Sequence, residues 1–254
     1  GALLPDQSAA YDLWVRMVRE TLWLEVDQTP GIRTVIGLRG AVPGSMIWHG
    51  NPKNRFNDAI VLLWRDENDQ PHIREFPMTA DPGTYGFPEN ESSALYPNRH
   101  YPYINGWHRG YNALSIVPYG YRVRDDSNKN GHWDDDRNGW LDGGAEDRFR
   151  GGSGHNIHMA APSRGIQTQR IHNWSAGCQV IPGVQNWMEF IGHAWTGPGD
   201  QVDYFLLDAR DVADSVWTPC NQERGTHRCP HPIRELPIAL EGDTSAALAD
   251  EFDL

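Results

Sequence analysis

The feature that most constrains the fold is a series of short segments rich in Val, Ile, Leu and aromatic residues, separated by Gly, Pro, Asn and Asp. These segments are RTVIGLRG, DAIVLLWR, HIREFPMT and NALSIVPYGYRV, within residues 33–123. Branched and aromatic residues favour strands, and the residues between them favour turns. RDENDQP predicts a hairpin loop, and TADPGTYGFPENESS predicts a long loop of the kind that carries function. The chain is therefore predicted to be mostly β, with a mainly antiparallel sheet.

Two other segments have the spacing of helices. Residues 8–26 place apolar side chains three and four positions apart, with charged residues between them. Residues 183–195, GVQNWMEFIGHAW, repeat this pattern, and QVDYFLLD after them predicts a final strand. We therefore expect a mostly β protein with accessory helices.

Length and charge limit the classes of partner. The 254 residues, 39% of them hydrophobic, are enough for one core of good size. The formal net charge is −12, and no run of Lys and Arg is present to neutralise phosphates, so nucleic acid is not an expected partner. No stretch approaches the ~18 consecutive apolar residues of a membrane span, so none is expected.

The three cysteines are an odd count. Cys220 and Cys229 lie close together in CNQERGTHRC, whereas Cys178 is far from both. This pattern predicts one local disulfide, Cys220 to Cys229, and one free thiol, and hence an oxidising compartment. Three reduced thiols in a cytosolic enzyme fit the same count. A zinc site formed by Cys220, His227, Cys229 and His231 is a further alternative, with irregular ligand spacing.

An acidic repeat with a period of eight begins at residue 126. Its copies, DSNKNGHW and DDDRNGWL, follow the pattern D-x-[DN]-x-N-G. Alternate residues before a Gly turn aim their oxygens at one point, as in the first half of an EF-hand loop, although the bidentate Glu of a true EF-hand is missing. A solvated turn has a similar composition, but the doubling favours a structural calcium ion. The predicted ligands are Asp126, Asn128, Asn130, Asp134, Asp136, Asn138 and Asp142.

Cys178, in SAGCQVI, is a candidate nucleophile. Acyl transfer by a thiolate needs a base and backbone donors for an oxyanion, and the amides of Gly177 and Cys178 are candidate donors. Upstream, HNIHMA alternates so that Asn156 and His158 share one face of a strand. Taken alone, a cysteine at a strand start is more often a small buried hydrophobe, and a single histidine is more often structural.

The combination of these segments is similar to the catalytic domain of the L,D-transpeptidase (YkuD-type) family. IHMA is followed twenty residues later by SAGCQVI, then by a helix and a final strand. In that family an IHG-like strand supplies the base, and an S-H-G-C motif supplies the nucleophile. The resemblance spans about residues 31–210. It implies a β-sandwich or barrel, here with an inserted acidic loop resembling a calcium-binding loop and an N-terminal helix.

The resemblance also implies a role for each motif residue. Cys178 matches the nucleophile, His158 the base, Ser175 the first motif residue and Gly177 the glycine before the thiol. Ala176 stands where the family usually has a second histidine. The base is expected to hydrogen-bond to the thiol, with a neighbouring backbone carbonyl orienting the imidazole. The thiolate attacks a peptide carbonyl, and an amine or water resolves the thioester. No cofactor is expected for catalysis.

The substrates implied by the resemblance are peptidoglycan stem peptides, which imply a location in the periplasm, the cell envelope or outside the cell. Arg109 in NGWHRGY is a candidate carboxylate clamp, with an aromatic wall formed by Trp107, His108 and Tyr111. RIHNWSAGC supplies candidates to replace the missing histidine in lining the site. The predicted substrate-binding residues are His172, Asn173, Trp174, Arg109 and Trp107.

The predicted organisation is a helical segment (1–30), a catalytic domain (31–212) with the acidic loop (125–150) inserted, and a C-terminal extension (213–254) with the predicted disulfide and an acidic tail. Calcium is expected to rigidify the loop as a lid over the site. Two other functions remain open. One is a metal-dependent hydrolase that uses HNIH, His172 and the acidic loop as ligands. The other is a non-catalytic, calcium-braced cell-wall-binding module that uses tryptophans as stacking surfaces.

Overall fold

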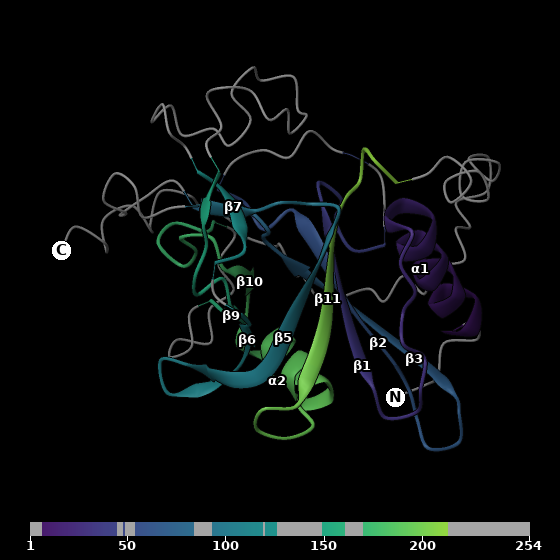
Figure 1. Ribbon diagram of the computed structural model, residues 1–254. Coiled ribbons are helices and arrows are strands. Elements are labelled where there is room, and N and C mark those ends of the chain that lie inside the picture. The colour runs from purple at the N-terminus through teal and green to yellow at the C-terminus, as the bar shows by residue number, and fades with distance from the viewer. Residues whose placement is uncertain are drawn as a thin grey trace, which may run out of the picture.

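The computed structural model describes residues 7–44, 48, 54–83, 93–118, 120–125, 149–160 and 170–212. These residues form two helices and eleven strands (Figure 1). The helices are α1 (Gln7–Leu22) and α2 (Val184–Ala194). The strands are β1 (Arg33–Arg39), β2 (Asp58–Arg65), β3 (Pro71–Met78), β4 (Ser93–Leu95), β5 (Arg99–His108), β6 (Tyr111–Ile116), β7 (Arg122–Asp125), β8 (Phe149–Gly151), β9 (Ile157–Met159), β10 (Gln179–Ile181) and β11 (Gln201–Asp208). The prediction of a mostly β fold with accessory helices is confirmed.

Eight strands form one sheet that nearly closes into a barrel. Their order is β10-β9-β6-β5-β11-β1-β2-β3. The β1–β11 and β9–β10 pairs are parallel, and the other pairs in this sheet are antiparallel. Two backbone hydrogen bonds between Thr79 and Val180, with N···O distances of 3.0 and 3.1 Å, join the end of β3 to β10. The two edges of the sheet therefore meet beside the segment that contains Cys178.

The central strands of this sheet are buried on both faces, so alternate residues enter two different cores. The inner core combines strand residues with the apolar face of α2, among them Ile60, Leu62, Phe76, Trp187 and Tyr204. The outer core lies under α1, which covers the outside of the sheet in Figure 1, and includes Trp14, Ile36, Leu38, Val61 and Leu63. Burial of each large apolar side chain stabilises the fold by ~1.5–3 kcal/mol. This two-sided burial explains the nearly continuous apolar runs of β1 and β2.

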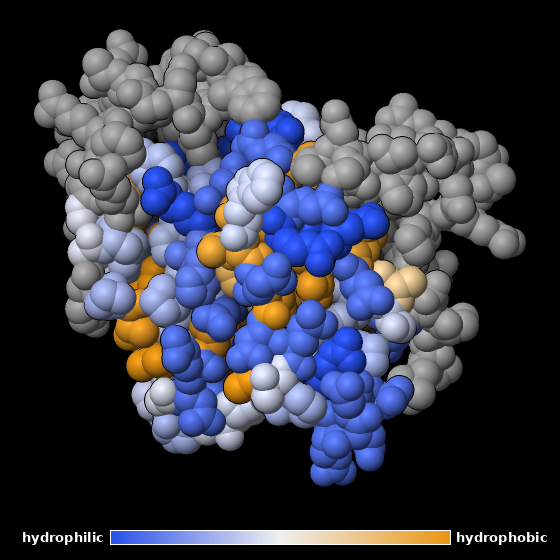
Figure 2. Space-filling view, turned by 45° about the vertical axis from the view of Figure 1, so that its right-hand side comes forward, coloured by the Kyte–Doolittle hydropathy of each residue, from blue (hydrophilic) through white to orange (hydrophobic). Residues whose placement is uncertain are grey.

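A small second sheet, in the order β4-β7-β8, is attached to the Cys178 segment. The backbone N–H of Ser93 in β4 donates to the carbonyl of Ala176 at 2.9 Å. On the face seen in Figure 2, apolar side chains occur in small groups between polar ones. No helix among the described residues is long and apolar enough to span a membrane. The acidic repeat with its predicted ligands, and Cys220 and Cys229, lie outside the described residues.

Candidate active site

The parallel pairing of β9 and β10 brings Cys178 and His158 to one face of the sheet. His158 lies opposite Val180 in this pair. Cys178 precedes Val180 by two positions, and side chains two apart in an extended chain point the same way. The pairing continues toward Cys178, because the N–H of Gln179 donates to the carbonyl of Asn156 at 2.9 Å. The predicted nucleophile and base are therefore diagonal neighbours, although they lie twenty residues apart in the chain.

Hydrogen bonds hold the turn that carries Cys178. The Ser175 hydroxyl donates to the carbonyl of Cys178 at 2.7 Å and accepts the N–H of Gly177 at 3.1 Å. The side-chain amide of Gln179 donates to the carbonyl of Gly177 at 3.2 Å, and its oxygen accepts the Tyr204 hydroxyl at 2.9 Å. Ser175 and Gln179 therefore hold the backbone on either side of the thiol. Ser175 acts as a positioning residue for Cys178.

Gly177 is required by its conformation and by its close neighbours. Its φ is +142°, a value that L side chains rarely adopt. A Cβ at this position would collide with the carbonyl oxygen of Ser93 and would lie 2.7 Å from Nε2 of His155. The Gly177 N–H already donates to Ser175. Of the two amides predicted for an oxyanion, only that of Cys178 lacks a partner among the described residues.

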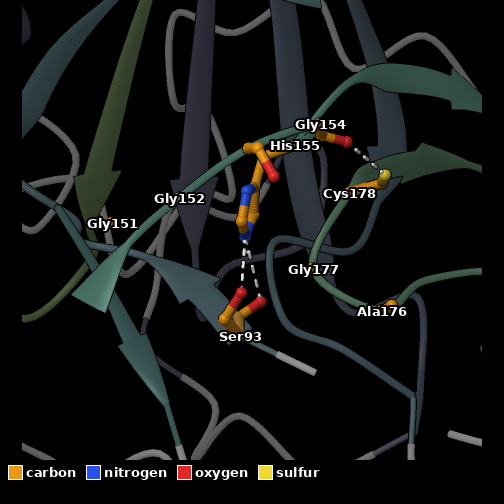
Figure 3. Close-up of a pocket in the computed structure, with 9 residues that line it drawn as sticks. Ser93, Gly151, Gly152, Gly154, His155, Ala176, Gly177 and Cys178 are labelled. Carbon is orange, nitrogen blue, oxygen red and sulfur yellow. Dashed lines mark hydrogen bonds between the residues drawn. The ribbon is translucent and has the colours of Figure 1, made fainter. Parts of the chain in front are cut away.

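Cys178 lines a small polar pocket of about 140 Å³ (Figure 3). The pocket walls are formed by Ser93, Gly151, Gly152, Ser153, Gly154, His155, Ala176, Gly177 and Cys178. Four of these residues are glycines, so much of the wall is backbone. The thiol donates to the carbonyl of Gly154, with an S···O distance of 3.3 Å. The hydrogen bond expected between Cys178 and His158 is therefore replaced, in this state, by a bond to the pocket wall.

His155, which the sequence singled out only as a possible metal ligand, forms the rigid side of this pocket. Its backbone N–H donates to the Tyr121 oxygen at 3.1 Å, and its Nδ1 lies 2.7 Å from the same oxygen. Its Nε2 lies 3.0 Å from the hydroxyl and 3.3 Å from the carbonyl of Ser93. Because a carbonyl only accepts, Nε2 carries the proton and Nδ1 accepts from Tyr121. Both ring nitrogens are therefore used within the protein.

His158 is buried, with 3% of its surface exposed, and its tautomer follows from one contact. Nδ1 lies 2.9 Å from the carbonyl of Met159, so Nδ1 carries the proton and Nε2 holds the lone pair. The orienting carbonyl predicted from the sequence is therefore present. Burial, with smaller contributions from His108 and the charge of Arg109, lowers the pKa of His158 to about 3, although the bond to the Met159 carbonyl acts to raise it. The imidazole is neutral at ordinary pH and has a free basic nitrogen.

The thiol of Cys178 is also neutral at rest. Burial raises its pKa to about 11, while the backbone N–H of Asn156 and the charge of Arg109 act to lower it. The site therefore holds no standing thiolate–imidazolium pair. A thiolate must be generated by proton transfer when a substrate is bound.

The predicted substrate-binding residues fall into two groups. Arg109 lies exposed in the turn between β5 and β6, and its charge acts on both Cys178 and His158. Trp107, at the end of β5, is 60% exposed and packs edge-on against Trp195, with ring centroids 5.7 Å apart. The second group lies on the segment before Ser175, where His172 and Asn173 are exposed and Trp174 is half-buried. Of these described residues, only Arg109 is linked electrostatically to the thiol.

The described residues contain no group of three or more His, Cys, Asp and Glu side chains arranged to hold a metal. His155 contacts Tyr121 and Ser93, whereas His158 contacts Met159. The HNIH segment therefore directs its two imidazoles to different partners. The absence of a metal-binding group among the described residues does not bear on calcium, because the acidic repeat lies outside them.

The chain matches no family model, no curated protein and no solved structure. Its function is therefore argued from the chemistry of this site.

Proposed function

We propose that the protein is a cysteine acyl-transfer enzyme of the L,D-transpeptidase kind, with Cys178 as nucleophile and His158 as base. The observation that carries the proposal is the shared face of β9 and β10, where the thiol and the imidazole are diagonal neighbours. The Met159 carbonyl leaves Nε2 of His158 unprotonated, which is the state a general base needs. Cys178 also lines a pocket, whereas an inert cysteine in a core would not be accessible in this way.

The proposed reaction begins when a peptide carbonyl binds beside the thiol. Nε2 of His158 takes the Sγ proton as the S–C bond forms, and the Cys178 N–H donates to the developing oxyanion. The imidazolium then returns the proton to the leaving amine as the C–N bond breaks. An incoming amine or water then loses its proton to Nε2 as it bonds to the acyl carbon, the S–C bond breaks, and the imidazolium returns that proton to the Cys178 sulfur. Burial of both groups favours this concerted transfer over a resting ion pair.

The proposed substrates are peptidoglycan stem peptides. They combine ammonium and carboxylate groups near the scissile bond, and Arg109 supplies a positive charge on the thiol side of the site. The exposed ring of Trp107 offers an apolar surface two residues away. These substrates place the protein in the periplasm or cell envelope, or outside the cell. Calcium in the acidic repeat remains part of the proposal, as a structural ion.

Incubation with muropeptides, followed by mass spectrometry, tests the proposal. Cross-linked dimers indicate a transpeptidase, and shortened stems indicate a carboxypeptidase or endopeptidase. Cys178→Ala is expected to abolish either product. Ser153→Ala is the matched control, since Ser153 lines the same pocket and has no proposed chemical role. Parallel reactions in calcium and in chelator show whether a bound ion supports turnover.

The outcomes separate the competing functions. Turnover that survives Cys178→Ala and is lost with a zinc-specific chelator indicates a metal-dependent hydrolase. Binding to peptidoglycan without any product indicates a cell-wall-binding module. The absence of product with every stem peptide tested would overturn the enzymatic proposal.

A further inference from the structure

A second imidazole covers the candidate base. The ring of His108 lies face to face with the ring of His158, with centroids 4.0 Å apart and planes 4° from parallel. His108 ends β5, whereas His158 lies in β9, and β6 separates these strands in the sheet. The hairpin between β5 and β6 therefore carries His108 over the base. The contact joins residues fifty positions apart in the chain.

The orientation of His108 is held by Asn156. The amide Nδ2 of Asn156 lies 3.4 Å from Nδ1 of His108, and an NH₂ group only donates. Nδ1 of His108 is therefore the acceptor, and its proton resides on Nε2. Asn156 is also the residue whose carbonyl pairs with Gln179 beside the thiol. One residue thus connects the covering ring to the Cys178 turn.

The surroundings of the two stacked rings disfavour protonation of either imidazole. Arg109 follows His108 in the hairpin turn, Tyr111 contacts both imidazoles from β6, and the thiol lies beyond Asn156. Only Arg109 among these carries a charge at neutral pH. Two imidazolium rings in face-to-face contact repel each other, and a cation beside them adds to the cost. Burial and the charge of Arg109 lower the pKa of His108 as well.

We propose that His108 is a positioning residue that covers one face of His158, fixes its ring and keeps it unprotonated. This inference rests on the proposed role of His158 as base. Its consequence is a base that remains neutral in acid, where an ordinary imidazole is protonated. With a pKa near 3, His158 is almost entirely neutral at pH 5. An imidazole of pKa ~6.5 would be only about 3% neutral at that pH, about 30-fold less.

The test is a histidine NMR titration of the full chain, with the His158 signal assigned by its loss in His158→Gln. His108→Ala exposes the base and is expected to raise its pKa by at least about one unit, toward ~6.5. His108→Phe keeps a flat ring over His158, so the His158 pKa is expected to stay closer to that of the unmodified protein. His100→Ala is the matched control. It removes another imidazole from β5, one that packs at a tilt on Phe205 and pairs with Asp203, and is expected to leave the His158 titration unchanged.

An unchanged His158 pKa in His108→Ala would overturn the inference. An equal rise of the His158 pKa in His108→Phe would also overturn it, because a flat ring over His158 would then have no effect on its protonation. Amide spectra report whether each variant is folded, and His108→Phe gives a second reading if His108→Ala is not. The acid limb of muropeptide turnover should shift upward in parallel with the His158 pKa. If the unmodified protein has no turnover, the proposed function fails while the titration still decides the role of His108.

Discussion

Two polar regions both contact the segment 79–83, and burial affects them in opposite ways. Around Arg39, the paired charges persist, although burial and Asp81 raise the pKa of the neighbouring Asp58 to about 7. Arg39 binds Asp81 at 3.0 Å and Asp208 at 2.9 Å. Burial alone would raise the pKa of Asp208, but Arg210 and Arg39 hold it below its usual value. Around Cys178, the buried His158 and the half-buried Cys178 and His108 have no carboxylate partner among the described residues, and all three shift toward their neutral forms.

The segment between the two regions connects them directly. Thr79 pairs with Val180, and the N–H of Gly83 donates to the carbonyl of Ser175 at 2.9 Å. Asp81, between them, belongs to the Arg39 cluster. The ion pairs of Arg39 with Asp81 and Asp208 can therefore anchor a loop, while an uncharged set of groups next to them remains able to exchange protons.

Removal of Arg39 should have the largest effect. Arg39→Met leaves Asp81 and Asp208 buried with one cation fewer, which is expected to destabilise the fold by ~3–5 kcal/mol. The free energy of unfolding, measured in urea, checks this value. Arg16→Met is the control, because its partner Glu20 is 3.9 Å away at the partly exposed surface and the pair is worth at most ~0.5 kcal/mol. A similar loss of stability in the two variants would mean that the buried ion pairs of Arg39 contribute no more than a surface pair, which would contradict the contrast.

The pH dependence of Cys178 alkylation tests the neutral region. Because the pKa of the thiol is raised to about 11, its thiolate fraction grows about tenfold per pH unit from pH 7 to 10 without a plateau. At pH 8 it should react about 200-fold more slowly than a free thiol of pKa ~8.5. Peptide mapping after iodoacetamide treatment gives the rate for this cysteine separately from Cys220 and Cys229. A plateau near pH 8 would show that the thiol is not held neutral.

Gly177→Ala should disturb the Cys178 turn specifically. The new Cβ meets the Ser93 carbonyl and His155 at a φ of +142°, so a loss of ~2 kcal/mol in stability is expected, together with changed Cys178 alkylation. Gly192→Ala is the matched control, since nothing lies within 4 Å of a Cβ there and the position is inside α2. That control should gain ~0.5–1 kcal/mol by removing a helical glycine. Equal behaviour of the two variants would disprove the close approach at Gly177.

The smallest effect is expected from Arg109. Arg109→Gln removes an exposed charge that lowers the thiol pKa, so Cys178 alkylation at pH 8 should slow by about twofold. The difference should vanish at high salt, because an exposed charge is screened. An effect that persists in 1 M salt would instead indicate direct contact with the thiol.

Much of the fold could be predicted from the sequence. The strands β1, β2, β3 and β11, and both helices, follow strong local patterns. The strand β5 was missed, although it is central, because RHYPYINGWH contains a proline and a glycine that weaken the strand pattern. The tight turn at 66–70 was predicted correctly, since the Asp66 carboxylate accepts the N–H groups of Asn68 and Gln70.

The candidate site could be predicted only in part. The motif located Cys178 and His158 and implied an orienting carbonyl, which Met159 supplies. It gave no signal for the pocket wall formed by Ser93 and His155. NGWHRGY placed His108 in the aromatic wall of the site but did not indicate that its ring stacks on His158. These contacts depend on strand order and on the hairpin between β5 and β6. His155 was visible in HNIHMA, but its partner Tyr121 was not.

The sequence by itself determined both helices, most of the strands, and which residues carry nucleophilic and basic groups, because those properties depend on local pattern and side-chain chemistry. Only the tertiary structure decided how those groups ionise. The near-closure of the barrel brings Thr79 to Val180 and places the buried His158 and the half-buried Cys178 beside that seam. The free energy of a buried charge depends on the partners that surround it in space, and those partners come from distant parts of the chain.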